Sequence, residues 1–554
     1  VIAACKPLIR SQLVNQKTAK HKIANNSIPV ASPWQPLSRQ LFRSLWIAAI
    51  ASNMATWMHD VGAAWLMTTL APSPLMVSLV QASTSLPLFV LALPAGAFAD
   101  VFDRRRLLLL TQGWMLVAAA GLAMLTAVGL TGPVLLLGFT FAIGVGTAFN
   151  APAWQAIVPE VVPREALSSA VALNSAGINL ARAIGPALGG LIVARLGPQA
   201  AFGLNALSFI GVIVVLYRWR REKPVNRLPA EHLFGAMVAG LRYARYAAGF
   251  RNVLGRAFLF VFPASALWGL LPLLARQELN LGASGYGILL GAVGLGAVSG
   301  AYFLPRIRKK IAVDKLTTGA TVIYAMVLLA LAMLRHVPLM VVIMLISGAM
   351  WITMLTALNV SAQSVAAGWV RARVLSVYLI VFFGSMAIGS IIWGALANVL
   401  TMTPVFLIAS AVAFVGTIAN RWLPLSSTEG IDLSPSLHWP TPNLDIPVKD
   451  ERGPALVTIE YQINPSEKTN FRRVMHELRA SRLRDGAIQW NLFNDPDVEE
   501  RYLEVFMVRS WIDHLRQHER VTEFDREIQD KLRTFLKVDT EPVVSHFIAE
   551  RTKD

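Results

Sequence analysis

The chain contains a series of apolar runs, each about 20 residues long, between Leu41 and Trp422. A run of that length is what an α-helix needs to cross the roughly 30 Å hydrocarbon core of a bilayer. A mean hydropathy of +0.52 and an apolar content of 55% agree with this interpretation. We therefore expect twelve membrane-spanning helices, near 44–69, 75–98, 107–129, 133–155, 167–193, 199–217, 252–274, 285–304, 316–334, 338–363, 374–399 and 403–422.

Basic residues fall mainly in the loops on one side of these helices. We count nineteen Lys and Arg on that side and three on the other, so the basic side and both termini are predicted to be cytoplasmic. The net charge of +17 follows from this topology, because residues 454–554 carry a small excess of acidic residues. We expect a multi-pass protein of the bacterial cytoplasmic (inner) membrane that contacts anionic lipid and binds no nucleic acid.

A basic loop separates the spans six and six, and the composition changes again after Trp422. The last hundred residues are expected to follow the order β-α-β-β-α-β, which is typical of a ferredoxin-like fold. The predicted strands are 455–463, 487–493, 502–508 and 543–548, and the predicted helices are 465–484 and 510–536. We expect an all-α membrane protein of two six-helix bundles plus a small soluble α+β domain. The predicted parts are a basic cytosolic tail at 1–40, a bundle at 41–217, a cytosolic central loop at 218–251, a second bundle at 252–422, a Pro-rich linker at 423–453 and a cytosolic ferredoxin-like domain at 454–554.

The loop between the second and third spans carries the most distinctive motif, Gly96-Ala-Phe-Ala-Asp-Val-Phe-Asp-Arg-Arg-Arg106. It resembles the loop motif of the major facilitator superfamily, with Asp103 where that family usually has a second glycine. We expect this loop to act as a conformational latch, with the topology signal alone as the alternative; the related loop at 300–310 has Leu304 in place of the acid. The residues assigned to the latch are Gly96, Asp100, Asp103, Arg104 and Arg105.

The fifth span contains closely spaced small residues around a proline, and it resembles the motif that the same superfamily associates with exporters. Glycines allow helices to approach closely and proline bends a helix, so this span is expected to form a moving contact between the bundles. Ordinary small-residue packing is the alternative. The residues concerned are Gly177, Gly185, Pro186, Gly189 and Gly190.

Three further stretches, at 41–60, 153–160 and 172–190, are similar to the enterobactin-exporter-like branch of that superfamily, also called transmembrane secretion effectors. The tail from 481 also resembles tails in that branch, and its order of elements resembles antibiotic-biosynthesis-monooxygenase-like domains. The resemblance implies proton-coupled export of a small amphiphilic molecule (a siderophore, drug or metabolite) by a transporter that is not an enzyme and needs no cofactor. Three alternatives stay open: import by the same fold, a tail with monooxygenase-like activity, and a homodimer formed through the tail.

Asp60 is the single carboxylate inside any of the predicted spans. An isolated carboxylate in a medium of low dielectric takes up a proton more readily than one in water, so Asp60 is the candidate proton-coupling residue. His59 lies next to it and titrates near neutrality. Arg182 lies at a similar predicted depth in the fifth span, so a permanent Asp60–Arg182 ion pair is one alternative and direct contact of Asp60 with the substrate is another.

Polar and aromatic residues on the first, fourth and tenth spans are expected to line a substrate cavity, because in the resembling family spans 1, 4, 7 and 10 line the path. The residues assigned to this cavity are Asn53, Trp57, Asn150, Trp154, Asn359 and Gln363. In the tail, His514 and His518 have the i,i+4 spacing of a metal site, but a solvated helix face is the favoured interpretation, so no metal is expected.

Overall fold

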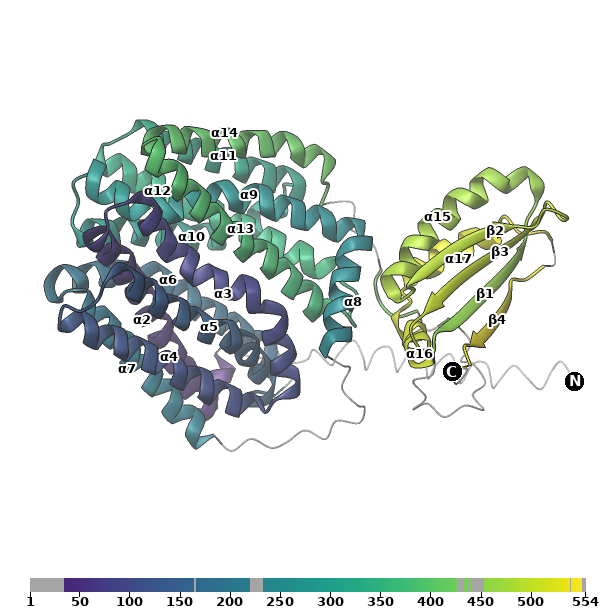
Figure 1. Cartoon of the computed structure of the whole chain (residues 1–554), viewed down its shortest axis with the longest axis horizontal. Coiled ribbons are helices and arrows are strands. Elements are labelled where there is room, and N and C mark those ends of the chain that lie inside the picture. The colour runs from purple at the N-terminus through teal and green to yellow at the C-terminus, as the bar shows by residue number, and fades with distance from the viewer. Residues whose placement is uncertain are drawn as a thin grey trace, which may run out of the picture.

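The protein has a large helical part and a smaller α/β part at its C-terminal end (Figure 1). The computed structural model describes residues 34–163, 166–219, 233–425, 432–436, 438–439, 453–538 and 540–550. Most of the predicted N-terminal tail, part of the central loop and much of the linker therefore lie outside the described residues.

The helical part consists of two sets of six long helices. The shorter α8 comes between the two sets in the chain and lies on the side that faces the C-terminal domain (Figure 1). The halves meet mainly where α3 packs against α13 and where α6 packs against α10. The first set is α2 (Gln40–Leu70), α3 (Pro74–Val101), α4 (Arg104–Ala127), α5 (Pro133–Val161), α6 (Leu167–Leu196) and α7 (Pro198–Arg218). The second set is α9 (Ala248–Leu273), α10 (Ala283–Arg308), α11 (Val313–Met333), α12 (Val337–Ser364), α13 (Arg371–Val399) and α14 (Met402–Ala419).

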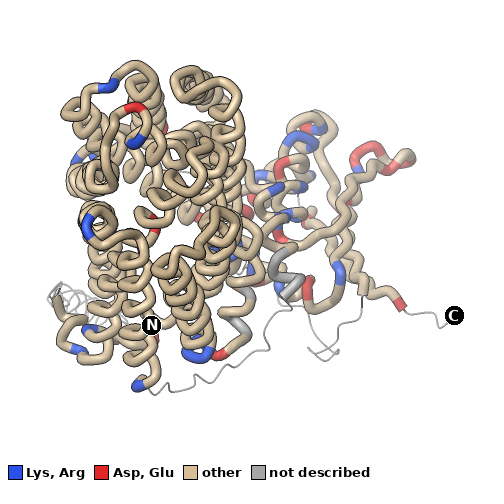
Figure 2. The backbone as a smooth tube through the Cα atoms, turned by 60° about the vertical axis from the view of Figure 1, so that its left-hand side comes forward, with Lys and Arg blue, Asp and Glu red and all other residues tan. Residues whose placement is uncertain are grey.

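Eleven helices in the described part of the chain are long and apolar enough to cross a membrane. The twelfth long helix, α2, has 31 residues but does not meet this criterion, because polar residues such as Asn53 and Asp60 lower its hydropathy. Figure 2 shows few charged residues along the middle of the helices and more at their ends and over the tail. The hydrophobic character is therefore that expected of a membrane domain, and α2 is the one long helix of the two bundles, among the described residues, that falls short of the criterion.

Helix α8 (Leu233–Tyr246) lies within 218–251, which the sequence predicts to be a loop, so this part of the prediction is wrong. Its Tyr243 is 1% exposed, and its hydroxyl donates a hydrogen bond to the backbone oxygen of Val365 at 2.7 Å. The helix α9 also begins at Ala248, four residues earlier than expected. The basic residues of this region indicate a cytosolic loop, whereas burial of Tyr243 against the end of α12 stabilises a helix here through a tertiary contact.

The C-terminal part is a four-stranded antiparallel sheet with helices packed on it. The strand order β2-β3-β1-β4 and the chain order β-α-β-β-α-β are those of a ferredoxin-like fold. The strand Val543–Ile548 begins and ends where the sequence predicted. The elements are β1 (Ala455–Gln462), α15 (Lys468–Asp485), β2 (Gln489–Asn494), β3 (Arg501–Val508), α16 (Trp511–Arg520), α17 (Glu523–Arg533) and β4 (Val543–Ile548).

A buried ion pair lies in the interior of this C-terminal domain. Arg482 Nε donates to Glu504 Oε1 at 3.0 Å, and the two side chains are 5% and 0% exposed. The Glu504 carboxylate also accepts hydrogen bonds from Tyr461 and Trp490, each at 2.8 Å. Because each oxygen of this buried carboxylate has partners, the charge is compensated within the domain.

We expect Glu504→Ala to destabilise the C-terminal domain by about 3–5 kcal/mol, because it leaves the buried guanidinium of Arg482 without its counter-ion. Glu499→Ala is the matched control: its carboxylate is 75% exposed and pairs with Lys468 at the surface, where little change is expected. Hydrogen–deuterium exchange of the full-length protein measures the effect as faster exchange in β1 and β3. Equal exchange rates in the two variants would contradict the compensating role of Glu504.

Candidate functional site: a cavity between the two halves

A cavity of about 330 Å³ lies between the two halves of the helical part. Its walls come from α2, α3 and α6 of the first half and from α9, α10, α12 and α13 of the second. It contains one carboxylate and one guanidinium among aromatic, aliphatic and uncharged polar side chains. Among its lining residues are Trp57, Asp60, Gln81, Arg182, Trp351 and Asn359.

Asp60 and Arg182 both line this cavity, so two residues that the sequence placed at similar depth do share one space. The two side chains form no ion pair within 4.0 Å in the described structure. Instead, the guanidinium carbon of Arg182 lies 5.9 Å from the ring centre of Trp57, a cation–π contact. The carboxylate of Asp60 is therefore available to a proton or a ligand.

His59 does not belong to this cavity. Its side chain is 1% exposed, and its ring lies 4.7 Å from the ring of Phe202 on α7. Neither ring nitrogen has a hydrogen-bond partner within the described structure. The adjacent residue on a helix points about 100° away, so His59 faces the interior of the first half while Asp60 faces the space between the halves.

Two of the six residues predicted to line a substrate cavity, Trp57 and Asn359, do so. Asn53 lies one turn beyond Trp57 on α2 and donates to the backbone oxygen of Ala49. The remaining three also lie off the cavity wall. Asn150 accepts hydrogen bonds from Thr111 and Gln112 on α4. Trp154 packs inside the first half, and Gln363 donates a hydrogen bond to Asn359.

The aromatic wall of the cavity was only partly foreseen. Trp268 and Trp351 have ring centres 5.2 Å apart, and Trp351 and Phe382 are 5.9 Å apart. On the opposite side, α3 contributes Gln81, whose amide nitrogen donates to Ser85 at 3.1 Å. The spacing of Gln81, Thr84 and Ser85 at i, i+3 and i+4 on a mainly apolar span was the signal that could have identified this polar stripe.

The small residues of α6 lie between α2 of the same half and α10 of the other half. A Cβ at Gly189 would lie 2.8 Å from the Cα of Met58, and one at Gly190 would lie 2.8 Å from the Cα of Gly287. Pro186 lines the same contact, since a Cβ at Gly287 would lie 2.7 Å from its backbone oxygen. This close contact lies at the end of the helices away from the basic loops.

The remaining glycines of the motif face α2. A Cβ at Gly177 would lie 2.8 Å from Cγ1 of Ile50, and one at Gly185 would lie 2.7 Å from the Cβ of Trp57. Gly185 thereby sets how closely α6 approaches the helix that carries Asp60. The motif thus connects the cavity wall to the contact between the halves.

The loop predicted to be a latch is tied mainly to its own half. Arg104 forms an ion pair with Glu160 at 2.7 Å, and Arg105 donates to the backbone oxygens of Leu216 and Tyr217 at the end of α7. Asp103 caps α4 by accepting a hydrogen bond from the Arg106 amide at 2.9 Å. An acid outside the predicted latch residues, Glu160, therefore takes part in holding this loop.

The approach of this loop to the second half is looser. A Cβ at Gly96 would lie 3.6 Å from Oγ of Ser376 on α13, and a space of about 370 Å³ lies beside it between α3, α5 and α13. The side chain of Asp100 lies outside the described residues. The halves are therefore in close backbone contact at the end away from the basic loops and more separated near them.

The C-terminal domain contains a second and larger cavity, of about 620 Å³, between its sheet and the helices α16 and α17. Three histidines, His514, His518 and His546, lie at its wall. His514 is 1% exposed, so the expectation of a solvated helix face at this position is wrong: the amphipathic α16 turns His514 toward the cavity. Burial lowers the pKa of His514 to about 3 and that of His518 to about 4, which keeps both imidazoles neutral at pH 7.

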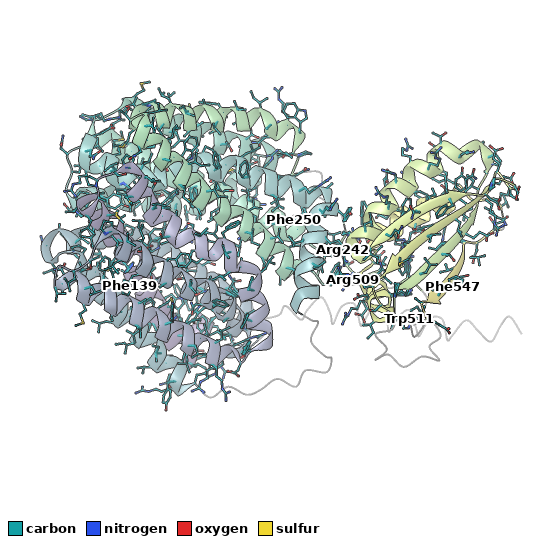
Figure 3. All side chains as sticks on the ribbon, in the orientation of Figure 1. Phe139, Arg242, Phe250, Arg509, Trp511 and Phe547 are labelled. Carbon is teal, nitrogen blue, oxygen red and sulfur yellow. The ribbon has the colours of Figure 1, made fainter. Side chains whose placement is uncertain are left out.

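The C-terminal domain contacts the helical part through α8 and the segment between α12 and α13. The guanidinium carbon of Arg520 lies 4.4 Å from the ring centre of Trp369, and that of Arg484 lies 5.9 Å from the ring centre of Tyr243. Figure 3 places Arg242 of α8 and Arg509 of the C-terminal domain at this boundary. Burial, together with nearby guanidinium groups, lowers the pKa of Arg242. These contacts join the C-terminal domain to the second half near the basic loops.

Comparison with known proteins identifies the family of the chain. A family model described as transmembrane secretion effector matches residues 31–553. The chain is 24% identical over 383 residues to the staphyloferrin A transporter of Staphylococcus aureus, which covers 68% of this chain and 95% of that protein. It is 29% identical over 265 residues to the enterobactin exporter EntS of Salmonella choleraesuis, which covers 47% of this chain and 62% of that exporter.

Solved transporter structures share the fold of the helical part. A bacterial homologue of the human lysosomal transporter Spinster, in an inward-facing and occupied conformation, matches with a TM-score of 0.56 and 14% identity. The match covers 71% of this chain and 97% of that one. At this level of identity the likeness concerns the fold alone, which is the two-bundle fold that the sequence predicted.

Proposed function

The chain belongs to the transmembrane secretion effector family of major facilitator transporters, and we propose that it exports a small amphiphilic molecule by alternating access, driven by the proton gradient. One observation carries the proposal: a cavity walled by both halves holds the Asp60 carboxylate among aromatic side chains, and in the described part of the chain this carboxylate forms no ion pair. A site built from both halves can be exposed to either side of a membrane when the halves rock. The proposed location is the bacterial inner membrane, with the basic loops and both termini in the cytoplasm.

The cavity favours a cargo with an apolar body and a hydrogen-bond donor. Trp268 and Trp351 supply flat apolar surface, while Gln81 and Asn359 offer amide groups. Siderophores combine these properties, and the relatives named above handle staphyloferrin A and enterobactin. Drugs with a similar amphiphilic character belong to the same proposed class of cargo.

Proton-driven export requires that proton and cargo exclude each other at one site, because simultaneous binding would carry both in the same direction. Asp60 can provide this exclusion. In its ionised form the carboxylate accepts a hydrogen bond from a hydroxyl, amide or ammonium group of the cargo. Protonation from the opposite side of the membrane removes the charge of the carboxylate, which weakens this hydrogen bond and favours release of the cargo.

Inverted membrane vesicles test the proposal directly. With an acidic interior, vesicles that contain the protein are expected to accumulate at least one member of a panel of catecholate, hydroxamate and hydroxycarboxylate siderophores and amphiphilic drugs. Accumulation is expected to disappear when an ionophore collapses the pH gradient, with protein-free vesicles as the control. Accumulation only in right-side-out vesicles would instead support import, and accumulation that survives the ionophore would contradict proton coupling.

Two further properties are proposed for the C-terminal domain. Its role is accessory to transport, since it contacts the second half at α8 and Trp369 without reaching the central cavity.

The C-terminal domain also has a surface on which a second copy of the chain can pack. This surface is the sheet face opposite its helices, where Phe493 and Phe547 are more than half exposed. Sedimentation of the detergent-solubilised full chain, compared with a Phe493→Lys and Phe547→Lys double variant, tests whether this face forms a homodimer: an unchanged mass would contradict it.

A further inference from the structure

The three histidines of the C-terminal domain are arranged as ligands of a single ion. His514 and His518 come from adjacent turns of α16, and His546 comes from the edge strand β4. One ring nitrogen from each lies within 4.8 Å of the other two. Residues so far apart in the sequence meet here because β4 returns beside β1, on the face of the sheet that α16 covers.

The distance between two of the ring nitrogens is that of neighbouring metal ligands. Nε2 of His514 and Nε2 of His518 are 3.3 Å apart. Two imidazole nitrogens at about 2.0–2.1 Å from a tetrahedral ion are separated by about 3.3 Å. Without an ion, one of these nitrogens has to donate a proton to the other, and a cation takes the place of that proton.

A neighbouring amide fixes the orientation of the first ligand. Nδ1 of His514 lies 3.3 Å from Oε1 of Gln517, which is itself 1% exposed. A histidine that donates from Nδ1 to such an oxygen presents the lone pair of Nε2 to the ion, which is the usual arrangement around metal-bound histidines. His438, which also lines the cavity, has both ring nitrogens engaged by Ser436 and Gln529.

The surroundings of the histidines tolerate a cation. The nearest strong positive charge, the guanidinium of Arg482, is neutralised by its buried ion pair with Glu504. His546 is exposed on an edge strand, so rotation of its side chain can bring its nitrogen about 1.5 Å closer to the other two. Three histidine ligands leave the fourth position of a tetrahedral ion open, and the cavity of about 620 Å³ lies on that side.

We propose that His514, His518 and His546 bind one divalent transition-metal ion, with its open coordination position facing the cavity of the C-terminal domain. Three neutral imidazoles without a carboxylate favour ions of intermediate softness, such as Zn²⁺, over Mg²⁺ or Ca²⁺. The ligand class for the open position is an organic molecule with an oxygen donor and an apolar body. The cavity offers that body the aromatic rings of Trp439, Phe506 and Trp511.

The experiment uses the full-length protein in detergent, purified without a polyhistidine tag and stripped with a chelator. Titration with Co²⁺ is expected to produce the intense visible absorption of a four-coordinate ion, with one ion bound per chain and displacement by Zn²⁺. His546→Gln and His518→Gln are expected to weaken Zn²⁺ binding by at least about a hundredfold, since each removes a direct ligand. His476→Gln on the exposed face of α15 is the matched control and is expected to leave binding unchanged.

Two results would overturn the proposal. One is the absence of any Co²⁺ or Zn²⁺ binding beyond that of the triple His514→Gln, His518→Gln, His546→Gln variant. The other is wild-type affinity in His546→Gln, which alters an exposed residue and is not expected to disturb folding. Hydrogen–deuterium exchange of each variant in the absence of metal separates a lost ligand from a misfolded domain. The proposal is independent of the transport assay, because metal binding is read without any cargo.

Discussion

Replacing Asp60 with asparagine is expected to abolish proton-driven accumulation while leaving downhill movement of cargo intact. The amide keeps the volume and part of the hydrogen-bonding capacity of the side chain but cannot exchange a proton. Inverted vesicles carrying Asp60→Asn should therefore reach only the cargo concentration of the medium, and their rate of counterflow should not depend on pH. Asp60→Glu, which keeps the carboxylate, should retain part of the accumulation.

His59→Leu is the informative comparison for this experiment. The sequence alone associates His59 with the proton, whereas the structure buries its ring against Phe202 and away from the cavity. Neither ring nitrogen of His59 has a hydrogen-bond partner among the described residues, so replacing the ring with an apolar side chain should cost little stability. Wild-type accumulation in His59→Leu together with its loss in Asp60→Asn assigns coupling to the carboxylate. Intact accumulation in Asp60→Asn would remove that assignment.

A permanent Asp60–Arg182 ion pair, the alternative to proton coupling, can be tested by the stability of single and double variants. If Asp60 and Arg182 formed a permanent pair, then the double variant Asp60→Asn, Arg182→Gln would recover the stability that either single variant loses. The geometry favours no recovery, because Arg182 lies over the ring of Trp57 and forms no ion pair with Asp60 within the described structure. Thermal unfolding of the four proteins measures this coupling.

The order of the elements other than α8 could be predicted from the sequence, because this order depends on local composition. Apolar runs of about 20 residues predict spans whatever surrounds them, and alternation from 455 to 463 predicted β1 directly. The helix α8 was not predicted, because the arginine-rich composition of the surrounding segment indicated a loop. Its own residues are mostly apolar with two arginines, and its helix is stabilised by burial of Tyr243 against Val365, a contact between residues far apart in the sequence.

The cavity was harder to predict because it depends on depth along each helix as well as on the face of the helix. Asn53 and Asp60 lie on nearly the same face of α2, but they are about 10 Å apart along its axis. Only Asp60 reaches the space between the halves. Asn150 was assigned from a resemblance that places the fourth span on the path; here α5 turns Asn150 toward Gln112 of α4. Which residues line the cavity therefore depends on which helices face each other, and this is not encoded in any one span.

Enlarging Gly190 is expected to have the second largest effect on transport. A Cβ at this position would lie 2.6 Å from the backbone oxygen of Ala283 and 2.8 Å from the Cα of Gly287. Both are backbone atoms of α10, so no change of rotamer can relieve the contact. Gly190→Leu should therefore disfavour the conformation seen here, in which the halves are closed at the end away from the basic loops.

The expected cost of this overpacking is about 3 kcal/mol, which shifts the balance between conformations by about a hundredfold. Transport should fall by at least tenfold, because the protein would remain open toward one side. Gly211→Leu is the matched control: Gly211 is exposed on α7, and a Cβ there would meet nothing within 4 Å.

Cysteine labelling can show the direction of this shift. The chain has one native cysteine, Cys5, so Cys5→Ser provides a background for a reporter cysteine at Ala64, which lines the cavity. A membrane-impermeant maleimide added to right-side-out vesicles should label this reporter faster in Gly190→Leu than in Gly211→Leu. Equal labelling rates with normal transport would mean that the α6–α10 contact does not open during the cycle. In that case the halves would have to separate at the α3–α13 contact alone, where Gly394 lies against Ser78.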